Sequence, residues 1–192
     1  MSNQVSSKIK VAILGKNADH LASELQVTRA SLDEADVAIF IVSAHDGITR
    51  ADIEEWQRAR ELYIPSIVAI SETESGELDF DDMSAIASKM LDPLLIRYLV
   101  LYDDTSMPVA LIDLETLKII DYSTGEAVIR ESEQEHRDLV ETYREDYFEM
   151  TEGMDSGAVG AGLIYPAFPW IQGKNIGLDQ LKEILESIPG IR

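Results

Sequence analysis

A glycine-lysine pair follows the first apolar run of the chain, at the place where a phosphate-binding loop would begin. The run is Val11–Leu14 and the pair is Gly15-Lys16. In the motif G-x-x-x-x-G-K-[ST], the second glycine lets backbone N–H groups surround the phosphates, the lysine reaches the terminal oxygens and the hydroxyl holds Mg²⁺. If Gly15 is the first glycine, those three positions hold His20, Leu21 and Ala22. These side chains cannot build a phosphate cradle.

Two aromatic residues near the C-terminal end form the second candidate site. Phe168 and Trp170 stand among Pro166 and Pro169. Anchoring within the core or a loop is the first interpretation. The alternative is a surface for a protein partner, because exposed aromatic side chains on a rigid loop are typical anchors at interfaces.

The remaining candidates for metal binding have simpler explanations. The three histidines lie far apart and lack ligand spacing, so we interpret them as surface or capping residues: His20, His45 and His136. Turn formation and helix capping explain the clustered aspartates without a cation, although a hard cation would accept the same oxygens: Asp79, Asp81, Asp82, Asp103 and Asp104. We therefore expect no metal, no cofactor and no catalytic residue.

The composition is ordinary except for its charge. The chain has 192 residues, a formal net charge of -20 and a pI near 4.3. Such a surface repels phosphate backbones and anionic lipid, so binding to nucleic acid or a membrane is not expected. Disulfides and thiolate metal sites are excluded because there is no cysteine. A polar N-terminus and the lack of an apolar run of about 20 residues predict a cytoplasmic protein.

Strand and helix signals alternate along most of the chain. Apolar runs predict strands over residues 11–14, 37–42, 66–70 and 162–165. Helices are predicted over residues 49–62, 82–91 and 177–188. In the first, Thr49 is the expected N-cap, Asp52 completes a capping box, and the apolar face includes Leu62. This alternation is typical of a mostly parallel sheet that helices cover on both faces.

The middle third of the chain departs from that alternation. Short β-type runs over residues 98–102, 109–114 and 117–122 predict a small antiparallel meander. A long acidic helix is expected over residues 132–149, followed by a glycine-rich loop over residues 150–162.

The order of these segments resembles the G domain of translation elongation factor G and its release-factor relatives. Residues 28–47 resemble the stretch from the second switch helix into a core strand, and residues 54–68 resemble the next helix and strand. Residues 109–126 are similar to the small insert within that G domain, and residues 174–189 look like its final helix. The resemblance covers most of the chain from Thr28 onward.

The chain departs from the family pattern where the chemistry would take place. Too few residues separate Gly15 from Thr28 for the first switch and the turn that senses the γ-phosphate. The guanine-recognition motif Asn-Lys-x-Asp is replaced by Ser71-Glu72-Thr73-Glu74, in which only Glu74 could supply the carboxylate. The later guanine loop falls near residues 170–172 and also differs. The resemblance therefore implies a pseudo-GTPase that neither binds GTP tightly nor hydrolyses it.

We therefore predict one α/β domain over residues 1–192, a three-layer P-loop NTPase-like domain with an inserted subdomain over residues 98–153. The expected function is that of a non-catalytic scaffold that binds or regulates a protein partner. The alternative is a diverged nucleotide or small-molecule binder, or a hydrolase. It would use the crevice around Gly15, Ser43, Ala44 and Ser71, with a perturbed carboxylate at Glu72 or Glu74.

The partner surface is expected on the acidic insert, which would favour a basic partner over an acidic one. The absence of the family's early strands would leave the parallel sheet with an exposed edge, which dimerisation or a covering segment must protect. A homodimer is therefore a further expectation.

Overall fold

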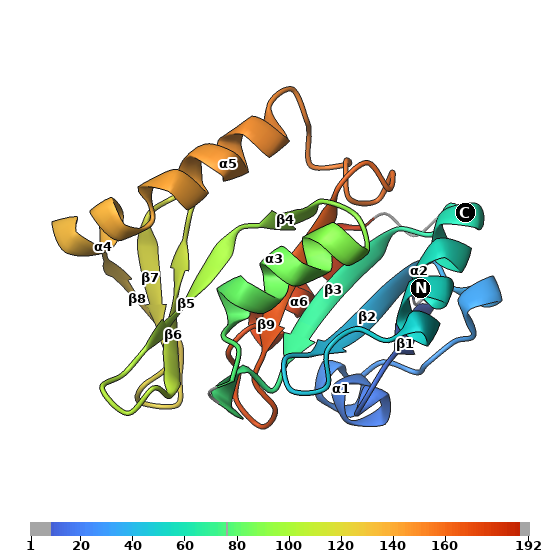
Figure 1. The fold of residues 1–192 in the computed structure, drawn as a ribbon, viewed down its shortest axis with the longest axis horizontal. Helices are drawn as coiled ribbons and strands as arrows, with labels where there is room; N and C mark the ends of the chain where they lie inside the picture. The colour runs from blue at the N-terminus through green and yellow to red at the C-terminus, as the bar shows by residue number, and fades with distance from the viewer. Residues whose placement is uncertain (1–8, 76, 189–192) are drawn as a thin grey trace, which may run out of the picture.

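The computed structural model describes residues 9–75 and 77–188, and its strands form two sheets (Figure 1). The first sheet is parallel, with the order β1-β2-β3-β9-β4: β1 (Val11–Leu14), β2 (Val37–Ser43), β3 (Ser66–Ser71), β4 (Leu94–Ile96) and β9 (Tyr165–Trp170). The second is antiparallel, with the order β5-β6-β7-β8: β5 (Tyr98–Tyr102), β6 (Pro108–Asp113), β7 (Lys118–Asp121) and β8 (Val128–Glu131). The predicted α/β class, a parallel sheet with a small antiparallel insert, is confirmed.

Helices cover both faces of the parallel sheet. The α-helices are α1 (Ala18–Leu25), α2 (Arg50–Glu61), α3 (Phe80–Met90), α4 (Gln134–Leu139), α5 (Glu141–Thr151) and α6 (Leu178–Ser187), with 3₁₀ turns η1 (Leu32–Glu34) and η2 (Thr73–Ser75). Trp56 of α2 packs on Tyr165 of β9, with ring centroids 5.4 Å apart. Trp170, five residues later in β9, contacts Glu24 of α1. Side chains an odd number of residues apart point to opposite faces of a strand, so α1 and α2 lie on opposite faces.

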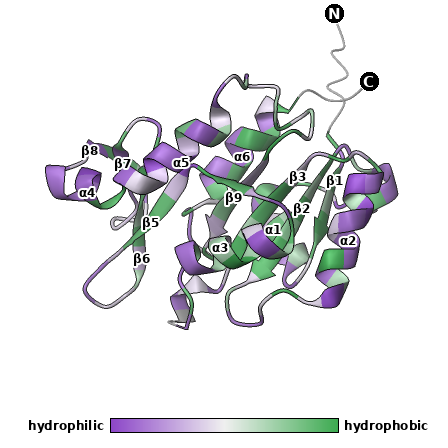
Figure 2. Ribbon diagram, turned by 45° about the horizontal axis from the view of Figure 1, so that its top comes forward, coloured by the Kyte–Doolittle hydropathy of each residue, from purple (hydrophilic) through white to green (hydrophobic). Residues whose placement is uncertain are grey.

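Burial on both faces explains why these strands are almost continuously apolar. Every residue of β2 and β3 is buried. Figure 2 shows the parallel strands largely in the colour of hydrophobic residues, and hydrophilic residues concentrated on helices such as α4 and α5. A parallel strand between two helical layers has no solvent-facing side, so an alternating pattern is not expected.

The start of α2 confirms the predicted capping box. The Thr49 N–H donates to Asp52 Oδ2 at 2.8 Å, and the Asp52 N–H donates to Thr49 Oγ1 at 3.3 Å. The predicted apolar face is wrong at its last position. Leu62 is the C-cap and is 42% exposed, because the helix ends at Glu61 and the chain turns there before it enters β3.

Residues 98–153 hold the second sheet and helices α4 and α5. The three predicted strands of the meander are present, but β8 follows them although no strand was predicted there. Its residues are all exposed, so it lacks the burial pattern of a strand that packs on a core. The single helix predicted over residues 132–149 is wrong: it breaks at Val140, whose φ and ψ are -101° and 4°. At this break Val140 is buried and Leu139 is exposed.

The strand predicted over residues 162–165 is wrong, because β9 begins at Tyr165 and runs to Trp170. Pro166 and Pro169 lie inside it, and prolines are ordinarily evidence against a central strand because they donate no hydrogen bond. The strand nevertheless pairs with both β3 and β4. Phe168 and Trp170 are 5% and 0% exposed, so burial agrees with the first interpretation, anchoring within the core, and the alternative of a partner-binding surface at these residues is wrong.

Two further elements were not predicted, namely α1 and β4. Helix α1 has only eight residues, and β4 has three, so neither offers a long periodic pattern. The ends of the predicted domain, residues 1–8 and 189–192, lie outside the described residues. Within the described ranges, no helix is both long and apolar enough to cross a membrane.

The outer edge of the parallel sheet at β1 is covered by the chain itself. The Ala30 N–H donates to the Val11 carbonyl at 2.9 Å, and the Arg29 guanidinium donates to the Ile13 carbonyl at 2.8 Å. A covering segment is one way in which a protein protects an edge strand. Of the two expected ways to protect this edge, the structure shows a covering segment at β1, and pairing between two copies stays a prediction.

Gly177 is the glycine at which we expect a side chain to be tolerated least. Its φ is 80°, and a Cβ atom there would lie 1.5 Å from the Pro169 carbonyl oxygen. We expect Gly177→Ala to lower the free energy of unfolding by about 1–3 kcal/mol more than Gly173→Ala does, because it adds overpacking to backbone strain. Gly173 is the matched control, since its φ is 75° but nothing lies within 4 Å of its Cβ position. Equal losses in urea denaturation would contradict this expectation.

Candidate functional site

Polar side chains from three strands meet at the carboxyl edge of the parallel sheet, where open α/β folds place their ligands. Lys16 follows β1, Asp46 lies in the turn after β2, and Glu72 follows β3. The Lys16 ammonium lies 2.8 Å from Asp46 Oδ2 and 2.9 Å from Glu72 Oε1. We call these three residues the lysine cluster.

Ser43, the last residue of β2, forms hydrogen bonds with two members of the lysine cluster. Its hydroxyl donates to Glu72 Oε2 and accepts from the backbone N–H of Asp46 at 2.9 Å. Ser43 is buried, so it fixes the Glu72 carboxylate and the turn that carries Asp46 in one arrangement.

The backbone around Lys16 leaves little space between strand and helix. Helix α1 begins at Ala18, so only Gly15, Lys16 and Asn17 separate it from β1. A Cβ atom on Gly15 would lie 2.4 Å from the Ile41 carbonyl oxygen, and the φ of Gly15 is 107°. The glycine therefore permits close contact with β2, and the chain enters α1 without the longer loop that the phosphate-binding motif needs.

The electrostatics of the lysine cluster favour its ionised state. The Ser43 hydroxyl, and then the Lys16 ammonium, lower the pKa of Glu72 below its ordinary value of 4.5. Hydrogen bonding to Lys16 also lowers the pKa of Asp46, and Asp46 and Glu72 together raise the pKa of Lys16. Two carboxylates around one ammonium leave this edge with a net negative charge.

His20 lies apart from the lysine cluster and belongs to the packing of α1. Its ring centroid is 6.2 Å from that of Trp170, and its Nε2 lies 3.5 Å from Glu24 Oε1. Glu24 also accepts from Trp170 Nε1 at 2.7 Å and from the Gly173 N–H at 3.0 Å. Glu24 thus ties the loop after β9 to α1. Leu21, which stands where the motif has its lysine, is fully buried.

The structure unites some of the predicted site residues and separates others. Gly15, Lys16 and Glu72 come together, and the buried Ser71 hydroxyl donates to the Val42 carbonyl at 3.5 Å. Glu74 is exposed in η2 and has no described contact with the lysine cluster. Asp46 was not predicted as a site residue, although its position just after β2, the strand beside β1, is a signal that could have identified it.

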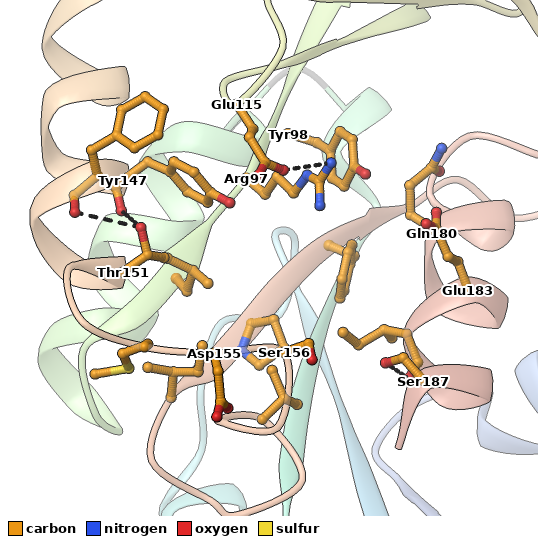
Figure 3. Close-up of a pocket in the computed structure, with 18 residues that line it drawn as sticks. Arg97, Tyr98, Glu115, Tyr147, Thr151, Asp155, Ser156, Gln180, Glu183 and Ser187 are labelled. Atoms are coloured by element: carbon orange, nitrogen blue, oxygen red, sulfur yellow. Dashed lines mark hydrogen bonds and ion pairs between the residues drawn. The ribbon is translucent and has the colours of Figure 1, made fainter. Parts of the chain in front are cut away.

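A cavity of about 460 Å³ lies elsewhere, between the C-terminal part of α5, β9 and α6 (Figure 3). At one end, Arg97 Nη2 contacts Glu115 Oε2 at 2.8 Å and Asp113 Oδ2 at 3.0 Å. Thr151 and Ser187 donate to backbone carbonyls of their own helices. The hydroxyls of Thr151 and Ser187 and the Arg97 guanidinium are therefore already bonded within the protein.

Comparisons with known proteins agree with the fold. The chain is similar to a protein of Thermus thermophilus whose crystal structure is known, with 27% identity and a TM-score of 0.69 over 83% of this chain and 27% of that one. It is also 30% identical to the GTPase Der of Synechococcus sp. (strain JA-2-3B'a(2-13)) over 73 residues, which are 38% of this chain and 16% of that protein. No protein-family model matches. These similarities support a G-domain-like relationship, and the chain spans about a quarter or less of either relative.

The lysine cluster predicts how Glu72 titrates. We expect Ser43→Ala and Lys16→Met each to raise the pKa of Glu72, with the larger change for Ser43→Ala, because each removes a hydrogen bond to the carboxylate. Carboxyl ¹³C NMR over a pH series measures the change, and Lys118→Met, at an exposed lysine in β7, is the control. An unchanged Glu72 titration in both variants would contradict the arrangement.

The sign of the stability effect follows from the same shift. Because the pKa of Glu72 is lower in the folded chain than in the unfolded chain, its ionisation stabilises the fold above pH 4.5. That contribution is lost as the pH falls through the lowered pKa. Urea denaturation of the wild type and Ser43→Ala should therefore differ more at pH 7 than at pH 3.

Proposed function

We propose that this protein is a non-catalytic, cytoplasmic relative of the translational GTPases that binds or regulates a protein partner. The observation that carries the proposal is the lysine cluster, in which Lys16, beside the place of a phosphate loop, is held by Asp46 and Glu72. A lysine that serves a nucleotide instead reaches the β- and γ-phosphates.

Breaking the ion pairs of Lys16 with Asp46 and Glu72 would not create a phosphate site. A solvent-exposed ion pair stabilises by about 0.2–1 kcal/mol, so separating Lys16 from its partners would cost little. A phosphate entering there would then meet Asp46 and Glu72 without their cation. The two carboxylates would repel an anionic ligand that displaced Lys16 from between them.

The alternative of a hydrolase or small-molecule binder at this edge has less support. A general acid or base that works near neutral pH needs a carboxyl group with a raised pKa, whereas the pKa of Glu72 is lowered. Leu21 and Trp170 are fully buried near this edge and fill space that a ligand would need.

The acidic surface supports a role in protein binding. With a net charge of -20, the chain attracts basic partners over long range and repels nucleic acid and anionic lipid. Residues 98–153 form an antiparallel sheet and two acidic helices, and these elements lie to one side of the parallel sheet (Figure 1). A surface of this kind is suited to a regulatory contact, and the resemblance to translational GTPases favours a contact within translation.

Calorimetric titration of the nucleotide-stripped protein with GTP and GDP in the presence of Mg²⁺ tests the proposal. We expect no binding heat and no shift of the melting temperature, because no cradle of backbone N–H groups precedes α1. A G domain with an intact phosphate loop, titrated in the same buffer, is the positive control. Binding at micromolar affinity, about -8 kcal/mol, would overturn the proposal.

A further inference from the structure

A second cavity, open and apolar, lies between α3 and α5. Its volume is about 500 Å³. Its floor comes from β4 and β5 and includes Leu94, Ile96 and Leu99. Helices α3 and α5 both contact β4 and lie on either side of it (Figure 1). We call this cavity the α3–α5 groove.

The rim of the α3–α5 groove is acidic on both sides. Asp81 lies on α3, and Asp146 and Glu149 lie on α5. Within the described chain, none of these three carboxylates takes part in an ion pair, and no lysine, arginine or histidine lines the groove. The groove therefore combines an apolar floor with negative charge that has no cation of its own.

Helix capping explains the neighbours of Asp81 but not Asp81 itself. Asp79 is the N-cap of α3 and accepts from the Asp82 N–H at 2.9 Å. One carboxylate oxygen of Asp81 is fully covered and has no hydrogen-bond partner in the described structure. An unsatisfied buried acceptor is unfavourable, and more so when it is charged. A cation bound beside this carboxylate would offset its charge.

The cavity in Figure 3 provides a comparison, because Tyr147 of α5 lines both cavities. There, Arg97 contacts Glu115, so that cavity contains its own cation. The α3–α5 groove has no equivalent residue within the described ranges. Asp155 and Glu183 also line the first cavity, so it too is acidic, and the α3–α5 groove differs from it in having no cationic side chain among its described lining residues.

We propose that the α3–α5 groove docks a basic amphipathic helix of a protein partner. Apolar side chains of the partner lie on the groove floor, and its lysine or arginine side chains bind the three rim carboxylates. Helices α3 and α5 have 11 residues each, about 16 Å, which matches three turns of a docked helix better than a compact small molecule. This inference rests on the proposed function, since it assigns the chemistry of the partner.

The test uses the full chain and a fluorescent 14-residue helical peptide of leucine and lysine, with a matched peptide in which glutamine replaces lysine. We expect the lysine peptide to bind and the glutamine peptide to bind at least about tenfold more weakly, as measured by anisotropy. Ala85 is an exposed groove residue on α3, and Ala85→Arg places a bulky cation among the carboxylates. It should weaken binding of the lysine peptide by about tenfold or more.

Matched controls separate the groove from the general acidity of the surface. Ile86 is the exposed neighbour of Ala85 but does not line the groove, so Ile86→Arg should leave binding within about twofold. The double variant Asp146→Asn/Glu149→Gln should weaken binding by about 2–30-fold, as expected for two exposed ion pairs. Glu141→Gln/Glu145→Gln, elsewhere on α5, is its control. Equal effects within either pair would overturn the proposal.

The pH dependence provides a second readout. Burial raises the pKa of Asp81 to about 6, with a further contribution from the charges of Asp79 and Asp82. The other titratable groups that face Asp81 are Tyr143 from α5 and Tyr102 from β5. Binding of the lysine peptide should weaken as the pH falls through about 6, and Asp81→Asn should remove that step. A step retained in Asp81→Asn would overturn the role of this carboxylate.

The outcomes distinguish this inference from the proposed function. If neither peptide binds while GTP also fails to bind, the groove assignment is wrong and the non-catalytic function stands. If GTP binds, the proposed function fails whatever the peptides do. If light scattering shows a dimer that Ala85→Arg dissociates, a second copy of this chain occupies the groove, and the assignment to a different partner is overturned.

Discussion

The parallel sheet imposes the constraint on which the rest of the structure depends. A parallel sheet needs helices on both faces, because each crossover between parallel strands returns over one face. Trp56 of α2 packs on Tyr165 from one side, and Trp170 bonds to Glu24 of α1 from the other. With both faces occupied, polar groups can gather only at the ends of the strands and on the outer surfaces of the helices.

The lysine cluster is a direct result of that arrangement. Strands β2 and β3 end together at Ser43 and Ser71, and β1 ends beside Phe40 of β2, so the residues that follow these strands meet whatever their separation in sequence. Glycine at position 15 lets the first turn approach β2 closely, and Ser43 holds Glu72 in place. The edge that binds ligands in many α/β folds is here closed by ion pairs among the chain's own residues.

The carboxylates of this acidic protein have different structural roles. Some carboxylates cap helices, as Asp79 does, and others bind cations of the chain, as Asp113 does with Arg97. The carboxylates on the rim of the α3–α5 groove do neither. Asp81 lies in the first turn of α3, where the helix dipole favours a negative charge, but Asp146 and Glu149 on α5 have no such position. The groove therefore presents carboxylates that no ion pair within the described chain compensates.

The sequence determined the class of the fold, the parallel strands β1 to β3 and the capped helix α2, because each depends on local periodicity and capping chemistry that residues a few positions apart express. It did not reveal that Phe168 and Trp170 are buried. The neighbouring Pro166 and Pro169 are evidence against a strand when the sequence alone is considered, and the strand forms because it pairs with β3 and β4. It identified Lys16 and Glu72, but the partnership with Asp46 joins residues 30 and 26 positions away. Only the tertiary structure decided those contacts, because ion pairs and grooves depend on which strand ends and helix faces become neighbours in space.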